Sequence, residues 1–62
     1  MTFAIKIYDC KYLKKVGLTD SIYDSDLLEF KSFSEAVKYI ESNFDESVRK
    51  SSKISIIRII DK

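Results

Sequence analysis

The 62-residue chain contains no histidine, one cysteine and one glycine. The absence of histidine removes the commonest general base and every nucleophile system that pairs serine or cysteine with histidine. Cys10 is the only thiol, so the chain cannot form an internal disulfide, and a zinc site lacks its usual ligands. A lone Gly17 does not make a glycine-rich phosphate loop. We therefore expect no enzymatic activity, no cofactor and no metal site.

Long hydrophobic runs are also absent. No apolar stretch approaches the roughly 20 residues that cross a bilayer. In the first fifteen residues the lysines follow the apolar part, which is the reverse of a secretory signal. We expect a cytoplasmic protein that does not interact with membranes.

The composition is that of a folded protein, with 45% hydrophobic and 34% charged residues. At this length we expect one small domain over residues 1–62. A domain of this size buries only about 60% of the surface that its unfolded chain exposes, so its stability is small. A homodimer is one way in which such a chain gains stability.

The first half of the chain predicts strands. Apolar and polar residues alternate over residues 2–8, which is typical of a strand with one buried face. A turn at about residues 9–10 leads to a second strand at 11–16. Residues 17–26 are rich in Asp and Ser and indicate a loop. A short third strand follows at 27–31.

One long helix is predicted after the third strand. Ser32 and Glu35 have the spacing of a capping box, in which each side chain bonds the other residue's backbone amide. Acidic residues at 45–46 precede basic residues at 49–50 by four positions, which favours a helix that continues to residue 49 or 50. The apolar residues recur at spacings of three and four: Phe33, Ala36, Val37, Ile40, Phe44 and Val48.

The final segment, 53–60, is rich in isoleucine. Ile54, Ile56 and Ile60 share one face of the predicted strand, and Ile57 and Ile59 share the other. A strand that is apolar on both faces is typically central in its sheet or covered on both sides. We predict an α+β fold of order β-β-(β)-α-β, with a hairpin-based antiparallel sheet of three to four strands and one long helix on one face. The last strand is expected beside the first and parallel to the strand before the helix.

Charge is distributed unevenly along the chain. Residues 1–17 carry four basic and one acidic residue, 18–46 carry two basic and eight acidic residues, and 47–62 carry five basic and one acidic residue. Basic residues interleaved with aromatics are what phosphate contacts and base stacking require. One hypothesis is therefore a small nucleic-acid-binding protein that uses the first hairpin. Its candidate contacts are Lys6, Tyr8, Lys11, Tyr12, Lys14 and Lys15.

The other hypothesis is binding to a protein. Carboxylates of the acidic segment are suited to a basic partner surface. The face of the last strand opposite the helix is an apolar patch of the kind that soluble monomers tend to hide. The candidate interface residues are Ile57, Ile59, Asp20, Asp24, Asp26 and Glu29.

The stretches "FAIKIYDCKYLKK" and "LLEFKSFSEAVKYIESNF" resemble short proteins encoded by phages and prophages of low-GC Gram-positive bacteria. Their pattern is a first strand of the form xxIKxxDxKYL, then an aromatic-containing strand that continues into a helix of the form FxSxxEAxxYI. The matching positions are Ile5, Lys6, Asp9, Lys11, Tyr12, Leu13, Phe30, Ser32, Glu35, Ala36, Tyr39 and Ile40. The resemblance implies a non-enzymatic accessory protein in the host cytoplasm. Such proteins commonly bind a host protein or defence complex and inhibit or redirect it.

Overall fold

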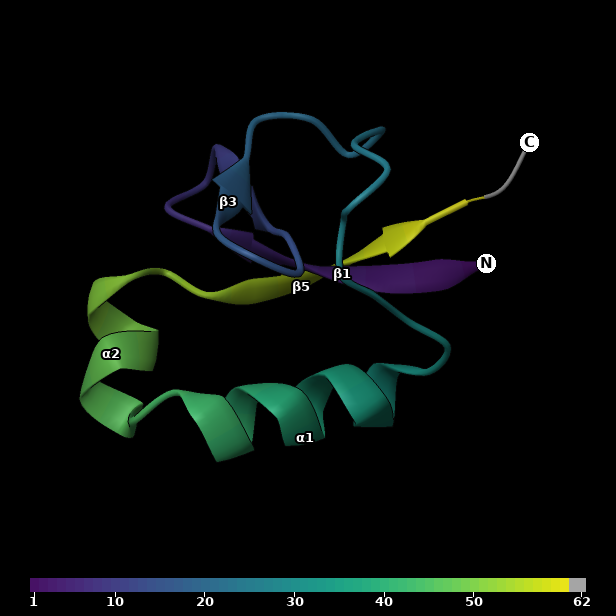
Figure 1. Ribbon diagram of the computed structural model, residues 1–62. Coiled ribbons are helices and arrows are strands. Elements are labelled where there is room, and N and C mark those ends of the chain that lie inside the picture. Colours follow the sequence, from purple (N-terminus) through teal and green to yellow (C-terminus); the bar gives the residue numbers. More distant parts are fainter. Residues whose placement is uncertain (61–62) are drawn as a thin grey trace.

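The computed structural model describes residues 1–60 and confirms the predicted α+β fold. Within these residues one antiparallel sheet carries a helix along one side, and a long loop lies on the other side (Figure 1). The strands are β1 (Thr2–Ile7), β2 (Lys11–Leu13), β3 (Leu18–Thr19), β4 (Glu29–Phe30) and β5 (Ser55–Ile59). The helices are α1 (Phe33–Asn43) and α2 (Glu46–Ser51).

β1 is the central strand. β5 pairs along one of its edges, from Thr2 opposite Ile59 to Lys6 opposite Ser55. β2 and β4 share the other edge, and β3 pairs with β2. Because β4 and β5 both run antiparallel to β1, they are parallel to one another. Both predictions for the last strand, its place beside β1 and its direction, are confirmed.

The core lies between β1 and α1. Ile5 and Ile7 are buried against Ile40, and half-buried residues from the hairpin, β4, α1 and β5 pack around them. The predicted cap starts α1, because the Ser32 hydroxyl accepts the Glu35 backbone N–H at 3.2 Å. The Glu35 carboxylate accepts the backbone N–H of Lys31, one residue earlier than a regular capping box would place it.

The predicted long helix is two helices. Phe44 has extended backbone, with φ −131° and ψ 130°, and the chain starts α2 with Asp45 as its N-cap. The Asn43 side chain donates to the Tyr39 carbonyl at 2.8 Å, and the Phe44 ring turns toward Tyr39, 6.5 Å away. Acidic residues at 45–46 therefore begin α2, where negative charge is favoured by the helix dipole. The apolar row predicted for one long helix is interrupted at Phe44. The first and last residues of that predicted row, Phe33 and Val48, are exposed.

The first turn is longer than predicted and β2 is shorter. Tyr8, Asp9 and Cys10 lie between the paired residues Ile7 and Lys11. Tyr8 and Asp9 have φ of 58° and 66°, a left-handed conformation that Asp tolerates and Tyr rarely adopts. β2 ends at residue 13, because the chain there turns to meet residues 26–28 of the loop.

β5 is not a central strand. Among residues 1–60 it pairs only with β1, so its outer edge is open. Ile54 and Ile56 pack on the core as predicted. Ile60 does not, since 72% of it is exposed just beyond the end of β5.

Candidate functional site

The sheet has a second surface opposite α1, which we call the far face. Side chains alternate across a strand, so the pairs of β1 with its neighbours determine which residues share this face. Since Ile5 packs toward α1, Ala4 points away from it, together with its partners Ile57 and Glu29. The same alternation places these residues on the far face: Thr2, Ala4, Lys6, Tyr12, Lys14, Leu27, Glu29, Ser55, Ile57 and Ile59.

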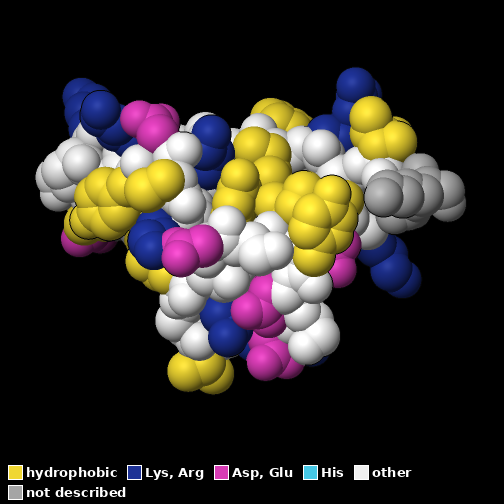
Figure 2. Space-filling view, turned by 90° about the horizontal axis from the view of Figure 1, so that it is seen from above, with side chains coloured by type: hydrophobic (Ala, Val, Ile, Leu, Met, Phe, Trp, Pro, Cys, Tyr) yellow, Lys and Arg dark blue, Asp and Glu magenta, His cyan; other side chains and the backbone are white. Residues whose placement is uncertain are grey.

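The centre of the far face is apolar. Ala4 and Leu27 are buried there, and Ile57 and Ile59 are half-buried. Neither isoleucine belongs to the core under α1, as the sequence predicted. The view onto this side of the molecule shows hydrophobic side chains in the middle and in separate places at the margin, with basic and acidic groups between them (Figure 2).

The loop between β3 and β4 lies over part of this side of the sheet (Figure 1). Backbone bonds hold its end, since Lys15 N–H donates to the Asp26 carbonyl and Leu28 N–H to the Leu13 carbonyl, at 3.0 and 3.1 Å. Leu27 is thereby brought onto the far face, where it is only 4% exposed. The loop therefore covers this side of β1, but it leaves Ile57 and Ile59 of β5 partly accessible.

Two ion pairs also hold the loop. Lys11 pairs with Asp20, and the Lys14 ammonium lies 3.5 Å from an Asp24 carboxylate oxygen. The hydrogen bond to Asp20 and the charge of Asp20 raise the pKa of Lys11 above its usual value. The backbone N–H of Asp26 donates to Asp24 at 2.8 Å and is the main cause of the lowered pKa of that carboxyl.

These pairs join the two sets of residues that the sequence offered as rival binding sites. Two lysines of the hairpin are neutralised by two carboxylates of the acidic segment, which lowers the charge that each could offer to a partner. Lys6 and Lys15 form no ion pair within residues 1–60. Tyr12 lies on the far face, whereas Tyr8 is exposed in the turn.

The remaining acidic candidates lie apart from one another. Glu29 is on the far face in the row Glu29–Ala4–Ile57 and accepts the Thr2 hydroxyl at 2.7 Å. Asp26 is exposed in the loop. The structure therefore brings Ile57, Ile59 and Glu29 together on one surface, and it places the three aspartates in the loop beside it.

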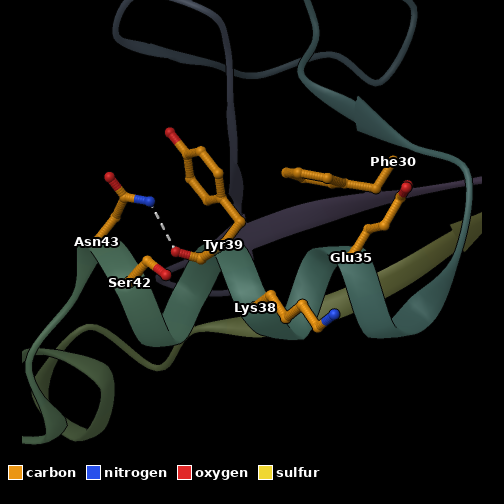
Figure 3. A pocket seen from close by; sticks show the side chains of 6 residues that line it. All are labelled: Phe30, Glu35, Lys38, Tyr39, Ser42 and Asn43. Atoms are coloured by element: carbon orange, nitrogen blue, oxygen red, sulfur yellow. Dashed lines mark hydrogen bonds between the residues drawn. The ribbon is translucent and has the colours of Figure 1, made fainter.

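A shallow hollow lies on the other side of the molecule, against α1 (Figure 3). The rings of Phe30 and Tyr39 lie side by side there, with centroids 5.3 Å apart. Polar groups at its margin have local partners: Glu35 accepts the Lys31 amide, and Asn43 donates to the Tyr39 carbonyl. No polar groups converge on the hollow, which makes it a poorer candidate site than the far face.

Residues 1–60 contain no cluster of three or more His, Cys, Asp or Glu side chains placed to hold a metal ion. Within the same residues, no helix combines the length and the apolar character needed to span a bilayer. No protein-family model, curated protein or solved structure that was compared with the chain matches it.

One feature of this region was missed by the sequence prediction, namely the open edge of β5. The prediction took two apolar faces as a sign of a central strand. The available signal was the order of the elements: the first hairpin occupies one edge of β1, and the strand before the helix is short enough to share that edge.

Proposed function

We propose that the protein is a non-enzymatic accessory protein of phage type. It acts in the host cytoplasm by binding a host protein or defence complex, which it inhibits or redirects. The observation that supports this proposal is the far face, where Ile57 and Ile59 are partly accessible beside the open edge of β5. We propose the far face as the contact surface.

The composition of the far face suits a protein partner. Protein interfaces have an apolar centre and a polar rim. Here the buried Ala4 and Leu27 continue into the two isoleucines, and Ala4 is flanked by Glu29 across on β4 and by Lys6 two residues along β1. A rim that carries both signs of charge favours a partner with complementary groups of both signs.

Nucleic acid is the second candidate partner, because the first hairpin is rich in lysine. Binding to a phosphate backbone depends on the number of lysines that neutralise phosphates. Lys11 and Lys14 are engaged with carboxylates of the loop, so a nucleic acid would have to displace those carboxylates. The hairpin therefore offers fewer available cations than its sequence indicated.

The proposal is tested by retention of host proteins on immobilised variants. Ile59→Lys places a charge on the far face, and Ser42→Lys adds the same charge to an exposed position of α1. From a lysate of a low-GC Gram-positive bacterium, we expect the wild-type chain and Ser42→Lys to retain the same protein. We expect Ile59→Lys to lose it, because a lysine that must be desolvated at an interface weakens binding. The retained protein is then purified and its affinity for all three chains measured.

Circular dichroism of each variant shows whether its fold is intact, and Ile59→Thr replaces Ile59→Lys if the latter unfolds. Equal affinity of all three chains for the purified protein would exclude the far face as the contact. Binding to random double-stranded DNA that weakens steeply with salt would instead favour the nucleic-acid hypothesis.

A further inference from the structure

β5 is the longest open edge in the sheet that residues 1–60 form. The other strands whose outer edges are open, β3 and β4, have two residues each, whereas β5 has five. Natural sheets protect long edges with charged side chains, proline, bulges or a covering segment, and the single Arg58 gives β5 little of this protection. β5 contains no proline, and its one charged residue, Arg58, is exposed. Three of its five residues are isoleucine.

The direction of the backbone groups of β5 follows from one hydrogen bond. Tyr8 directly follows β1, and its N–H donates to the carbonyl of Ser52, which precedes β5 in the chain. This N–H therefore points toward the side of β1 on which β5 lies. Because N–H groups alternate in direction along a strand, the even-numbered residues of β1 bond toward β5. Their partners Ile57 and Ile59 therefore bond toward β1. Ile56 and Arg58 direct their N–H and C=O groups outward, where residues 1–60 supply no partner strand.

We propose that a second copy of this chain pairs with this edge, β5 against β5, antiparallel about a two-fold axis at Ile57. A two-fold interface must be self-complementary, and an antiparallel pair of identical strands satisfies this requirement for backbone bonds. The outward backbone groups and the charge of Arg58 favour an axis at Ile57 over one at Arg58, and the apolar contact of Ile57 with its symmetry mate further favours it, as follows.

On β5 the backbone N–H and C=O groups that point outward belong to even-numbered residues. Two copies of β5 can therefore form backbone hydrogen bonds only in registers that place even-numbered residues opposite even-numbered residues. An axis at Arg58 would set the two arginines directly opposite each other, and like charges in that position are destabilising. An axis at Ile57 sets Ile56 opposite the partner's Arg58 and exchanges both backbone bonds at each such pair. It also sets Ile57 opposite Ile57 in a non-hydrogen-bonded pair, where side chains lie closest.

This pairing extends the far face across two molecules. The isoleucines at 57 and 59 and their symmetry equivalents then form one apolar strip, in which each side chain covers part of its neighbours and the outer surface of the strip stays exposed. A five-residue edge buries less area than a standard interface, so the dimer is weak, with a dissociation constant on the order of 100 µM. The dimer does not depend on the host partner proposed above.

Two measurements test the dimer. Sedimentation equilibrium of the wild-type chain, carried from about 10 µM to about 1 mM, should show a monomer that shifts to a dimer, as this affinity requires. A monomer throughout that range would overturn the proposal, and so would assembly beyond a dimer.

The register is tested by oxidation in a Cys10→Ser background. Ile57→Cys places two thiols across the axis, where the Cα separation of about 4.5 Å in such pairs allows a disulfide. Ser55→Cys lies on the same face but four residues from its symmetry mate. We expect Ile57→Cys to form the covalent dimer at least about tenfold faster than Ser55→Cys, because its thiols are held together. Equal rates would overturn the proposed register.

The host-partner proposal fails separately, since it is tested by retention of a different protein. Loss of the dimer leaves the far face available to that protein, and absence of a host partner leaves the sedimentation result unchanged.

Discussion

Asp24 illustrates how single side chains hold the loop in place. Its carboxylate accepts the Asp26 backbone N–H at 2.8 Å and lies 3.5 Å from the Lys14 ammonium. Carboxylates in aspartate turns commonly bond the backbone two residues on, so the first contact is local and readable from sequence. The second contact depends on how the loop folds back along residues 14–15, which no local pattern indicates. This is why Asp24 and Lys14 were assigned to different candidate sites.

At the residue scale we predict that Asp24 contributes to the acid sensitivity of the fold. Its pKa is lowered in the folded chain, mainly by the Asp26 N–H, so folding favours the ionised carboxylate. The stabilisation is complete above about pH 4, the ordinary range of an aspartate, and is lost as pH falls through the lowered pKa. Asp24→Asn should therefore be less stable than wild type at pH 7 and nearly equal to it at low pH. Urea unfolding between pH 7 and pH 2.5 measures this difference.

Asp26→Asn is the matched control for that measurement. Asp26 is exposed, and its contribution to the turn comes from its backbone N–H, which the substitution keeps. Its unfolding midpoints should follow those of the wild type at every pH. A difference between wild type and Asp24→Asn that is the same at pH 7 and pH 2.5 would contradict the prediction.

At the scale of elements, the sequence predicted the features that depend on local patterns. Alternation over β1, the Ser32 cap and the placement of Ile54 and Ile56 on the core were all correct. The helix break was missed because two local rules conflict at residues 45–46: acids four positions before bases support one helix, and acids in a first turn begin another. Packing of the Phe44 ring beside Tyr39 decides between them.

The break leads to a prediction about Phe44 and Val48, which a single helix would place on the same stripe. Phe44 packs on the core, whereas Val48 is 38% exposed on α2. Phe44→Ala should lower the free energy of unfolding by about 2 kcal/mol, since it removes a partly buried ring. Val48→Ala should lower it by less than about 0.5 kcal/mol. Urea denaturation measures both, and equal losses would contradict the observed break.

For the whole molecule, the site was predicted in part. The sequence identified Ile57 and Ile59 as isoleucines without a covering helix, and the structure places both on the far face with Glu29. It did not identify β5 as an edge strand, because the order of the elements allows β2 and β4 to share one side of β1 but does not require it. Nor could it indicate that the loop brings Leu27 over Ala4's side of the sheet, since residues 17–26 contain no periodic pattern.

The central claim is that β5 presents an unpaired edge beside the far face, and amide hydrogen exchange tests it directly. In dilute solution, residue-resolved exchange should be slow at Ile57 and Ile59, whose amides bond toward β1, and fast at Ile56 and Arg58, whose amides point outward. Protection at Ile56 and Arg58 should increase with protein concentration as the edge becomes paired. Slow exchange at all four amides in dilute solution would contradict the account, because it would mean that the outer edge of β5 is already occupied.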